Sequence, residues 1–139
     1  MLTDSPGRAE GEIGMARDVV ETDGAPKSAA YSQAVKAAGL VFVSGQAGYD
    51  PATGQLAGST IQEQTRQCLK NVAAILEAAG SSLDKVVSAT IILRNPEDFA
   101  GMNEEWMAWF PTVQPARQGA SLPVDVEGLR VSIAAIAEA

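Results

Sequence analysis

The fold follows from residues 60–80, which read TIQEQTRQCLKNVAAILEAAG. Thr60 and Glu63 stand three positions apart, the spacing of a capping box, in which the hydroxyl and the carboxylate each accept a hydrogen bond from a backbone N–H at the start of a helix. Apolar residues then recur at every third or fourth position, and Gly80 follows as a helix stop. The stretch therefore predicts a helix with one apolar face, and we expect that face to lie on a sheet.

The segments before this helix predict two strands joined by a tight turn. Residues 31–35 and 40–46 flank Gly39, and residues 40–43 form a short apolar run rich in β-branched side chains. Residues 50–54 then read DPATG, with proline early and glycine late, which is typical of a turn. We therefore expect a β-hairpin, followed by a turn that leads towards the helix.

The segments after the helix predict one more helix and three more strands. Residues 86–93 are apolar and largely β-branched, which indicates a buried strand, and residues 118–122 and 129–137 are two further strand candidates. A second helix begins at Asn95-Pro96, with asparagine as the cap and proline at the first position. Its apolar stripe predicts packing against the sheet through Phe99, Met102, Trp106, Trp109 and Phe110.

Two helices and about five strands in the order β-β-α-β-α-β-β predict an α+β fold, in which both helices cover one face of a mixed sheet. The other face then needs a cover, and a partner subunit is the expected one. We assign residues 25–139 to this single domain. Residues 1–24 are rich in Gly, Asp, Glu and Ser without any period, which predicts a flexible N-terminal arm.

Composition excludes several classes of function. The 139-residue chain has a net charge of −7, which argues against a basic surface for nucleic acid and against docking on an anionic membrane. No stretch approaches the ~18 apolar residues of a membrane-spanning helix. The chain contains no histidine, which excludes Ser-His-Asp and Cys-His nucleophile systems and the usual zinc sites.

Cys68 is the single cysteine, and it falls on the apolar face of the first predicted helix. We predict a packed core thiol there, because the sequence offers no evident partner that would activate a nucleophile. One cysteine cannot form an intrachain disulfide, which is compatible with a reducing compartment. Because the first fourteen residues carry acidic side chains and lack the apolar segment of a secretory signal, we expect a cytoplasmic protein.

Arg117 is the first candidate functional residue. It follows Pro115 and Ala116 at the start of a segment that predicts a strand. A guanidinium there offers a planar set of donors, which matches a carboxylate through two parallel hydrogen bonds. The alternative is a structural ion pair with a neighbouring acid such as Glu127.

Eight short stretches, in this order and at these spacings, resemble the RidA/YjgF family of enamine/imine deaminases, also known as the L-PSP endoribonuclease family. The resemblance extends from about residue 25 to residue 137, over four-fifths of the chain. The stretches are AYSQA (30–34), VSGQ (43–46), DPATG (50–54), QTRQ (64–67), EAAGSSLD (77–84), DFA (98–100) with Asn103, PAR (115–117) and IAAIA (133–137).

The resemblance implies a chorismate-mutase-like α+β fold, a mixed sheet backed by two helices. It also implies a homotrimer whose sheets face inward, with a site in each cleft between neighbouring subunits. Members of the family use no metal and no organic cofactor, and we expect none for this chain.

The resemblance further implies which residues form the site. Arg117 matches the arginine that binds the substrate carboxylate, and Tyr31 matches a tyrosine that lines the pocket. Ser44 and Gly45 match the pocket backbone, and Asn103 matches a polar residue near the cleft. The implied reaction is hydrolysis of 2-aminoacrylate-type enamines, as their imine tautomers, to 2-oxo acids and ammonia.

Two positions depart from the family pattern. The active deaminases carry a glutamate fifteen positions after the arginine, where it holds the attacking water, and this chain has Ser132 there. Gly119, which the resemblance also places among the substrate-binding residues, stands where the family often has a cysteine. A serine hydroxyl can hold a water, but it is a poor proton acceptor near neutral pH. The spacing alone leaves open whether Ser132 faces the core or the pocket.

Three hypotheses follow from position 132. Ser132 itself orients the water for a labile imine, or an acid from either subunit does so, with Asp125, Glu127 and Glu138 as candidates. In the third hypothesis, this protein binds a small carboxylate, or acts on a different substrate, and does not deaminate 2-aminoacrylate. An endoribonuclease activity is a separate alternative, which the net charge of −7 and the absence of histidine disfavour.

Overall fold

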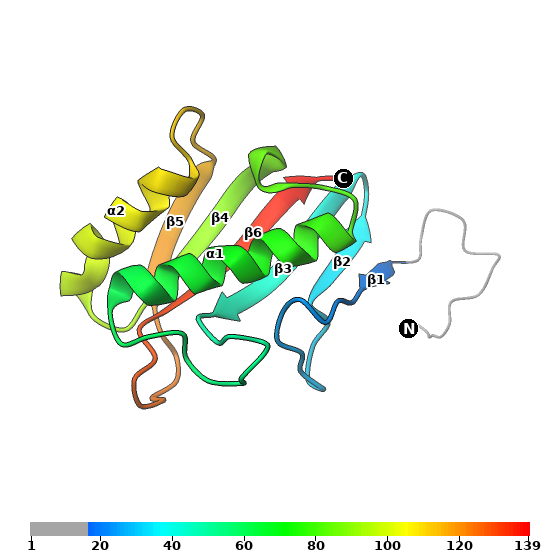
Figure 1. Ribbon diagram of the computed structural model, residues 1–139. Helices are drawn as coiled ribbons and strands as arrows, with labels where there is room; N and C mark the ends of the chain where they lie inside the picture. Colours follow the sequence, from blue (N-terminus) through cyan, green and yellow to red (C-terminus); the bar gives the residue numbers. More distant parts are fainter. Residues whose placement is uncertain (1–16) are drawn as a thin grey trace.

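The computed structural model describes residues 17–139, and a six-stranded mixed sheet runs through them in the order β1-β2-β3-β6-β4-β5. Strands β4 and β5 are parallel, and the other neighbouring strands are antiparallel. Both helices lie on one face of this sheet, α1 across β3 and β6, and α2 beside β5 (Figure 1). The elements are β1 Asp18–Val20, β2 Ala34–Ala37, β3 Leu40–Ala47, α1 Ile61–Ala78, η1 Leu83–Lys85, β4 Val86–Leu93, η2 Pro96–Asp98, α2 Phe99–Trp109, β5 Ala116–Ser121 and β6 Val131–Glu138.

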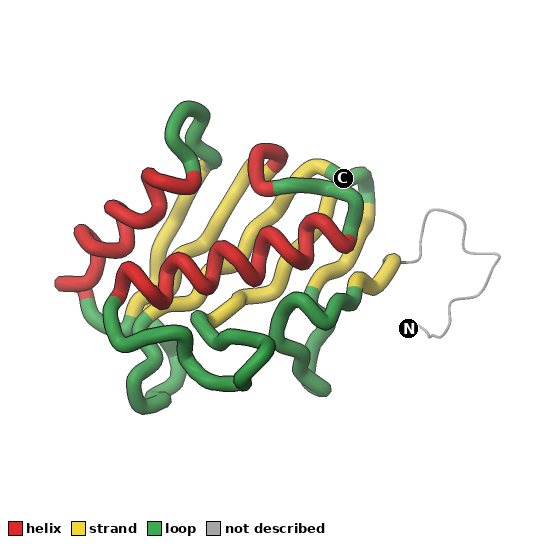
Figure 2. The backbone as a smooth tube through the Cα atoms, in the orientation of Figure 1, coloured by secondary structure: helices red, strands yellow, loops and turns green. Residues whose placement is uncertain are grey.

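The two-layer arrangement is plain in the backbone trace, where the helices lie in front of the strands and long loops gather at one end of the sheet (Figure 2). The structure confirms the predicted α+β architecture of one mixed sheet and two helices. Helix α1 is buried on one side only, as the spacing of its apolar residues predicts. Its buried residues are Ile61, Gln64, Thr65, Cys68, Leu69, Asn71, Val72, Ile75 and Leu76.

The capping box at the start of α1 is present as predicted. The Thr60 hydroxyl accepts a hydrogen bond from the Glu63 N–H at 3.1 Å, and the Glu63 carboxylate accepts one from the Thr60 N–H at 3.1 Å. At the other end, Gly80 has a φ of +83°, a left-handed conformation that favours glycine and ends the helix.

We expect Thr60→Ala to lower the free energy of unfolding by about 1 kcal/mol, because the Glu63 N–H loses its acceptor. Urea denaturation followed by circular dichroism measures the difference. Thr112→Ala, in the exposed loop after α2, is the matched control and should change stability by less than about 0.5 kcal/mol. Equal effects of the two substitutions would show that the cap does not stabilise α1.

Cys68 is fully buried within the apolar core, with its sulfur 3.6 Å from the Val131 carbonyl oxygen. Burial raises the pKa of the thiol far above its ordinary value, so the group stays protonated at neutral pH. The prediction of a packed core thiol is confirmed.

The side chains of β6 alternate between the two faces of the sheet. Val131, Ile133, Ala135 and Ala137 are buried on the face that packs against α1, whereas the residues between them are only half-buried. Ser132 therefore points to the opposite face, over which neither α1 nor α2 lies (Figure 1). We call this the helix-free face.

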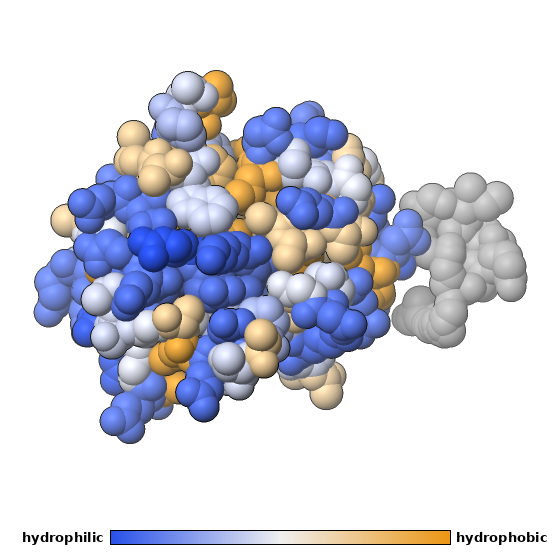
Figure 3. Space-filling model, in the orientation of Figure 1, coloured by the Kyte–Doolittle hydropathy of each residue, from blue (hydrophilic) through white to orange (hydrophobic). Residues whose placement is uncertain are grey.

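An apolar row crosses the helix-free face. Val19, Val35, Phe42 and Ile136 are successive register partners on β1, β2, β3 and β6. Val19 is 60% exposed and Phe42 is 40% exposed, so no part of residues 17–139 covers them fully. The outer surface of the helix layer, by contrast, is largely hydrophilic (Figure 3).

The structure differs from the sequence prediction in three places. Residues 18–20, which were predicted to belong to a flexible arm, form β1, and Val20 is buried there. The second helix begins with the short 3-10 helix η2, and the Asn95 side chain makes no capping hydrogen bond. The ends of the predicted strands shift by up to three residues. Residues 1–16 of the predicted arm lie outside the described residues.

Neither α1 nor α2, the longer helices within residues 17–139, combines the length and the apolar character that crossing a membrane requires.

Candidate functional site

Arg117 lies on the edge strand β5 and points to the face that the helices cover. Its register partner on β4 is Ala89, which is 3% exposed. The guanidinium carbon Cζ lies 5.1 Å from the ring centroid of Trp106 and 5.6 Å from that of Phe99, both on α2. These distances fall within the ~6 Å range of cation–π contacts. We call Arg117, Trp106 and Phe99 the arginine cradle.

Within residues 17–139, the charge of Arg117 has no acidic partner. No ion pair among residues 17–139 involves Arg117, so the alternative of a structural pair with Glu127 is wrong. Burial lowers the pKa of the guanidinium from its ordinary value, yet arginine remains charged at neutral pH. Three other arginines do have partners: Arg66 pairs with Glu105, Arg94 with Asp125 and Arg130 with Asp98.

Trp106 holds the cradle in place. Its ring is 2% exposed and packs against Phe110 with the ring centroids 4.5 Å apart. Its indole Nε1 donates a hydrogen bond to Gln114 Oε1 at 3.0 Å, and the Gln114 amide also donates to the Phe110 carbonyl. Gln114 lies three residues before Arg117, so the loop between α2 and β5 is tied to the same tryptophan.

Sequence reasoning assigned Trp106 and Phe99 to the core alone. Trp106 is buried, but Phe99 is 52% exposed, and both contact Arg117. Their spacing of seven positions, two helical turns, is the signal that could have placed them on one face beside the next strand. Asn103 lies between them on that side of α2 and is half-buried.

A cavity of about 420 Å³ adjoins the cradle between β4, β5 and α2. Arg117 and Gly119 line it from β5, and the remaining lining is mainly apolar, with Ile91, Leu93, Phe99 and Met102. The structure therefore brings together Arg117 and Gly119, two of the predicted site residues, at one cavity, whereas Asn103 on α2 is not among the residues that line it. We call this group the arginine half of the candidate site.

Ser132 lies elsewhere, on the helix-free face. It pairs with Ile92 of β4 and with Ala47 of β3. A Cβ atom built on Gly45 would lie 2.9 Å from the Ser132 hydroxyl oxygen, so the absence of a side chain at position 45 leaves room for this hydroxyl. The predicted residues Gly45 and Ser132 are therefore neighbours in space.

Ser44 connects this region to the loop that carries Tyr31. The Ser44 hydroxyl donates to the Ser32 carbonyl at 2.6 Å, and its backbone N–H donates to the Gln33 carbonyl at 2.9 Å. Tyr31 is 55% exposed and lines a shallow cavity of about 380 Å³ beside β1. We call Ser132, Gly45, Ser44 and Tyr31 the serine half of the candidate site.

The two halves lie on opposite faces of one sheet. Arg117 is level with Ala89 on β4 and Ser132 is level with Ile92, three residues further along the same strand. An odd separation along a strand puts two side chains on opposite faces. Within one chain, therefore, Arg117 and Ser132 do not face a common pocket.

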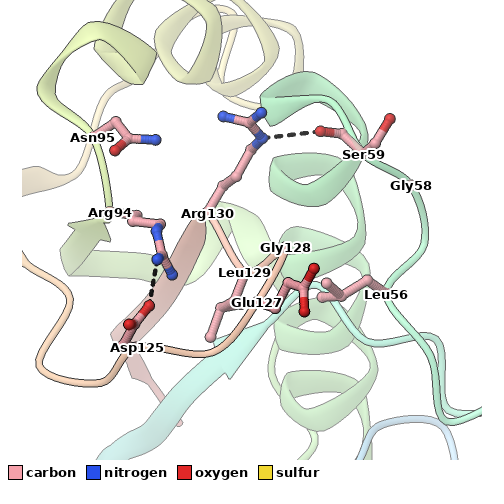
Figure 4. Close-up of a pocket in the computed structure, with 10 residues that line it drawn as sticks. All are labelled: Leu56, Gly58, Ser59, Arg94, Asn95, Asp125, Glu127, Gly128, Leu129 and Arg130. Carbon is pink, nitrogen blue, oxygen red and sulfur yellow. Dashed lines mark hydrogen bonds and ion pairs between the residues drawn. The ribbon is translucent and has the colours of Figure 1, made fainter.

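Within one chain, the three acids proposed as substitutes for glutamate are not grouped around Ser132. Glu138 lies six residues further along β6, roughly 20 Å away at about 3.3 Å per residue. Asp125 forms an ion pair with Arg94, and Glu127 lies in the same loop (Figure 4).

Asp125 and Glu127 line a separate, more polar cavity of about 650 Å³ at the end of the sheet (Figure 4). Its two arginines are already engaged. Arg94 donates to the Val126 carbonyl at 2.9 Å besides its pair with Asp125, and Arg130 donates to the Ser59 carbonyl at 2.9 Å and to Asp98 at 3.0 Å. These contacts hold the loop before β6, which is a structural role.

No group of three or more His, Cys, Asp or Glu side chains within residues 17–139 is arranged to hold a metal ion.

Comparison with known proteins identifies relatives over most of the chain. The family model described as Endoribonuclease L-PSP matches residues 22–139. A 2-iminobutanoate/2-iminopropanoate deaminase of Mus musculus is 39% identical over 122 residues, which cover 87% of this chain and 90% of the relative.

Solved structures agree with this match. The crystal structure of YyfA, a protein of the conserved Rid family from Yersinia pestis, superposes with a TM-score of 0.83 at 37% identity, covering 89% of this chain and all of YyfA. The structure of E. coli TdcF with bound serine superposes with a TM-score of 0.81 at 32% identity, covering 88% of this chain and 98% of TdcF. Sequence and fold together show that this chain belongs to the RidA/YjgF family, the family that the Endoribonuclease L-PSP model describes.

Proposed function

We propose that this protein is an imine deaminase, which binds a small 2-imino acid through its carboxylate and hydrolyses it to a 2-oxo acid and ammonia. The observation that carries the proposal is the arginine cradle. Arg117 presents a charged guanidinium at a cavity, supported by two aromatic rings and without an acidic partner among residues 17–139. A carboxylate is the ligand that such a group recognises best.

The relatives support this reading of the cradle. The Mus musculus relative is named as a deaminase of 2-iminobutanoate and 2-iminopropanoate, both of which are small carboxylates with a C=N bond. The TdcF structure contains serine, a small amino acid whose carboxylate is of the same kind.

The proposed chemistry makes modest demands on the protein. An enamine such as 2-aminoacrylate tautomerises to the imine, and a water oxygen then bonds to the C=N carbon as the nitrogen takes up a proton. The resulting carbinolamine loses ammonia and leaves the 2-oxo acid. The protein has to hold the carboxylate and orient one water. In our proposal Arg117 does the first and the Ser132 hydroxyl does the second.

We propose that the site is completed between subunits of a homotrimer. The arginine half and the serine half lie on opposite faces of the sheet, so a ligand can contact both only where the edge strand β5 of one subunit meets the helix-free face of the next. The uncovered apolar row Val19, Val35, Phe42 and Ile136 supports such an assembly, because burying it removes apolar surface from water.

Phe42→Glu is expected to break the assembly, because it buries a charge in the apolar row. Static light scattering should give about three times 14.4 kDa for the natural protein and about 14.4 kDa for the variant. Lys70→Glu, at an exposed position on α1 of the opposite layer, is the control and should keep the larger mass. A monomeric natural protein would overturn the inter-subunit site.

A carboxylate-binding protein without deaminase activity towards 2-aminoacrylate is the second candidate function. The observation that favours it is Ser132 itself, because a neutral hydroxyl accepts a proton poorly. In that case the arginine half binds its ligand and no turnover follows.

The deciding experiment uses a dehydratase that generates 2-aminoacrylate from serine, with and without this protein. Deaminase activity is expected to accelerate the release of 2-oxo acid above the spontaneous rate. No acceleration, together with binding of pyruvate by calorimetry, would favour the second candidate over the first.

A further inference from the structure

The cavity beside Arg117 has more apolar room than a three-carbon substrate uses. It measures about 420 Å³, and among residues 17–139 Arg117 is the only charged residue that lines it. Cavities of about 300–1,000 Å³ are the size that encloses drug-sized ligands. An arginine next to an apolar hollow suits a ligand with a carboxylate at one end and an apolar group at the other.

Gly119 is the residue that keeps this hollow open. It is the register partner of Ile91, whose side chain is buried, so a side chain at position 119 would point to the same face. The φ angle of Gly119 is not in the left-handed region, so the backbone does not require glycine there. A Cβ built on it would meet one nearby atom, the Ile91 carbonyl oxygen at 3.3 Å. The absence of a side chain at position 119 therefore leaves the cavity open, and the backbone conformation does not require glycine there.

The rest of the lining is mainly apolar, with Gln118 and Ser121 as its uncharged polar residues. Met102 is fully buried at one side, whereas Phe99 is 52% exposed even though it also supports Arg117. Covering a half-exposed aromatic ring with an apolar group removes apolar surface from water, which favours binding of a ligand that carries such a group. A ligand whose carboxylate binds Arg117 would bring its own side chain to this place.

We infer that the hollow formed by Gly119, Ile91, Leu93, Phe99 and Met102 binds the substrate side chain and selects 2-imino acids with branched or aromatic apolar side chains. This inference rests on the proposed carboxylate site at Arg117. It adds the substrate class: imines of the kind that oxidation of leucine or phenylalanine yields, in preference to the three-carbon imine from serine.

The test compares stable 2-oxo acids by isothermal titration calorimetry on the full-length protein. We expect 4-methyl-2-oxopentanoate and phenylpyruvate to bind at least about 10-fold more tightly than pyruvate, since each buried methylene adds roughly fourfold in affinity. Equal affinities for the three acids would overturn the inference and leave the proposed carboxylate site intact. Failure of all three acids to bind would overturn the carboxylate site and the inference together.

A size series at position 119 gives an independent readout. Gly119→Leu fills the hollow, and we expect it to lower the ratio of 4-methyl-2-oxopentanoate affinity to pyruvate affinity about 10-fold. Gly119→Ala adds one methyl group and should give an intermediate ratio. Thermal melting followed by circular dichroism verifies that both variants fold. A ratio that stays constant along the series would exclude Gly119 as the residue that sets side-chain preference.

Discussion

Arg117→Met is expected to abolish measurable binding of pyruvate and other 2-oxo acids. The methionine keeps an unbranched side chain against Phe99 and Trp106 but removes the charge and the paired donors that a carboxylate needs. Truncating one partner of a buried, hydrogen-bonded charge pair costs about 2–5 kcal/mol, which corresponds to a loss of affinity of roughly 30-fold or more. Isothermal titration calorimetry with pyruvate measures this loss of affinity.

Two further variants sharpen this experiment. Arg66→Met removes an arginine that already pairs with Glu105 on the outer side of the helix layer, and it should leave pyruvate affinity unchanged. Arg117→Lys should give an intermediate loss, because an ammonium group supplies charge without the planar pair of donors. Unchanged affinity in Arg117→Met would remove this residue as the carboxylate anchor, and the cradle would then have only a structural role.

Ser132→Glu is expected to raise the rate of imine hydrolysis by about 100-fold. A positioned carboxylate can accept a proton from the attacking water, whereas the serine hydroxyl can only orient it, and general-base catalysis contributes about 10²–10⁴-fold. Room for the longer side chain exists because residue 45 is glycine and Ser132 lies on the helix-free face. The dehydratase-coupled assay for 2-oxo acid release measures the rate.

Ala134→Glu places the same carboxylate on the same strand and face, two residues from position 132, and should not raise the rate. If Ser132→Glu is no faster than the natural protein, position 132 is not where the water is activated. The acids Asp125, Glu127 and Glu138 of a neighbouring subunit then become the groups to substitute next. If Ser132→Glu accelerates 2-oxo acid release and the natural protein does not, the natural protein is a carboxylate binder that does not deaminate 2-aminoacrylate.

Local sequence patterns predicted the elements of this fold well. The capping box at Thr60 and Glu63, the glycine at position 80 and the β-branched run at residues 86–93 each act over a few neighbouring residues, so their structural outcome is readable without the rest of the chain. The strand β1 escaped notice because it has three residues and owes its existence to pairing with β2, a contact between segments more than ten residues apart.

The candidate site was predictable in part. The sequence pointed to Arg117 as a cation suited to a carboxylate, and to its place on a strand. It did not reveal that Phe99 and Trp106 support the guanidinium, because their helical spacing is equally that of a buried stripe. The apolar hollow beside Gly119 likewise depends on how β5 packs against α2.

The sequence by itself determined how side chains are distributed over the faces of each strand and each helix. It also placed an arginine and a serine on two different strands. Only the tertiary structure decided that Arg117 and Ser132 face opposite sides of the sheet. The nine residues from 122 to 130 between β5 and β6 belong to neither strand, so the two-residue period cannot be counted through them. The relative faces are set by the pairing of β5 and β6 with β4, which is a property of the folded sheet.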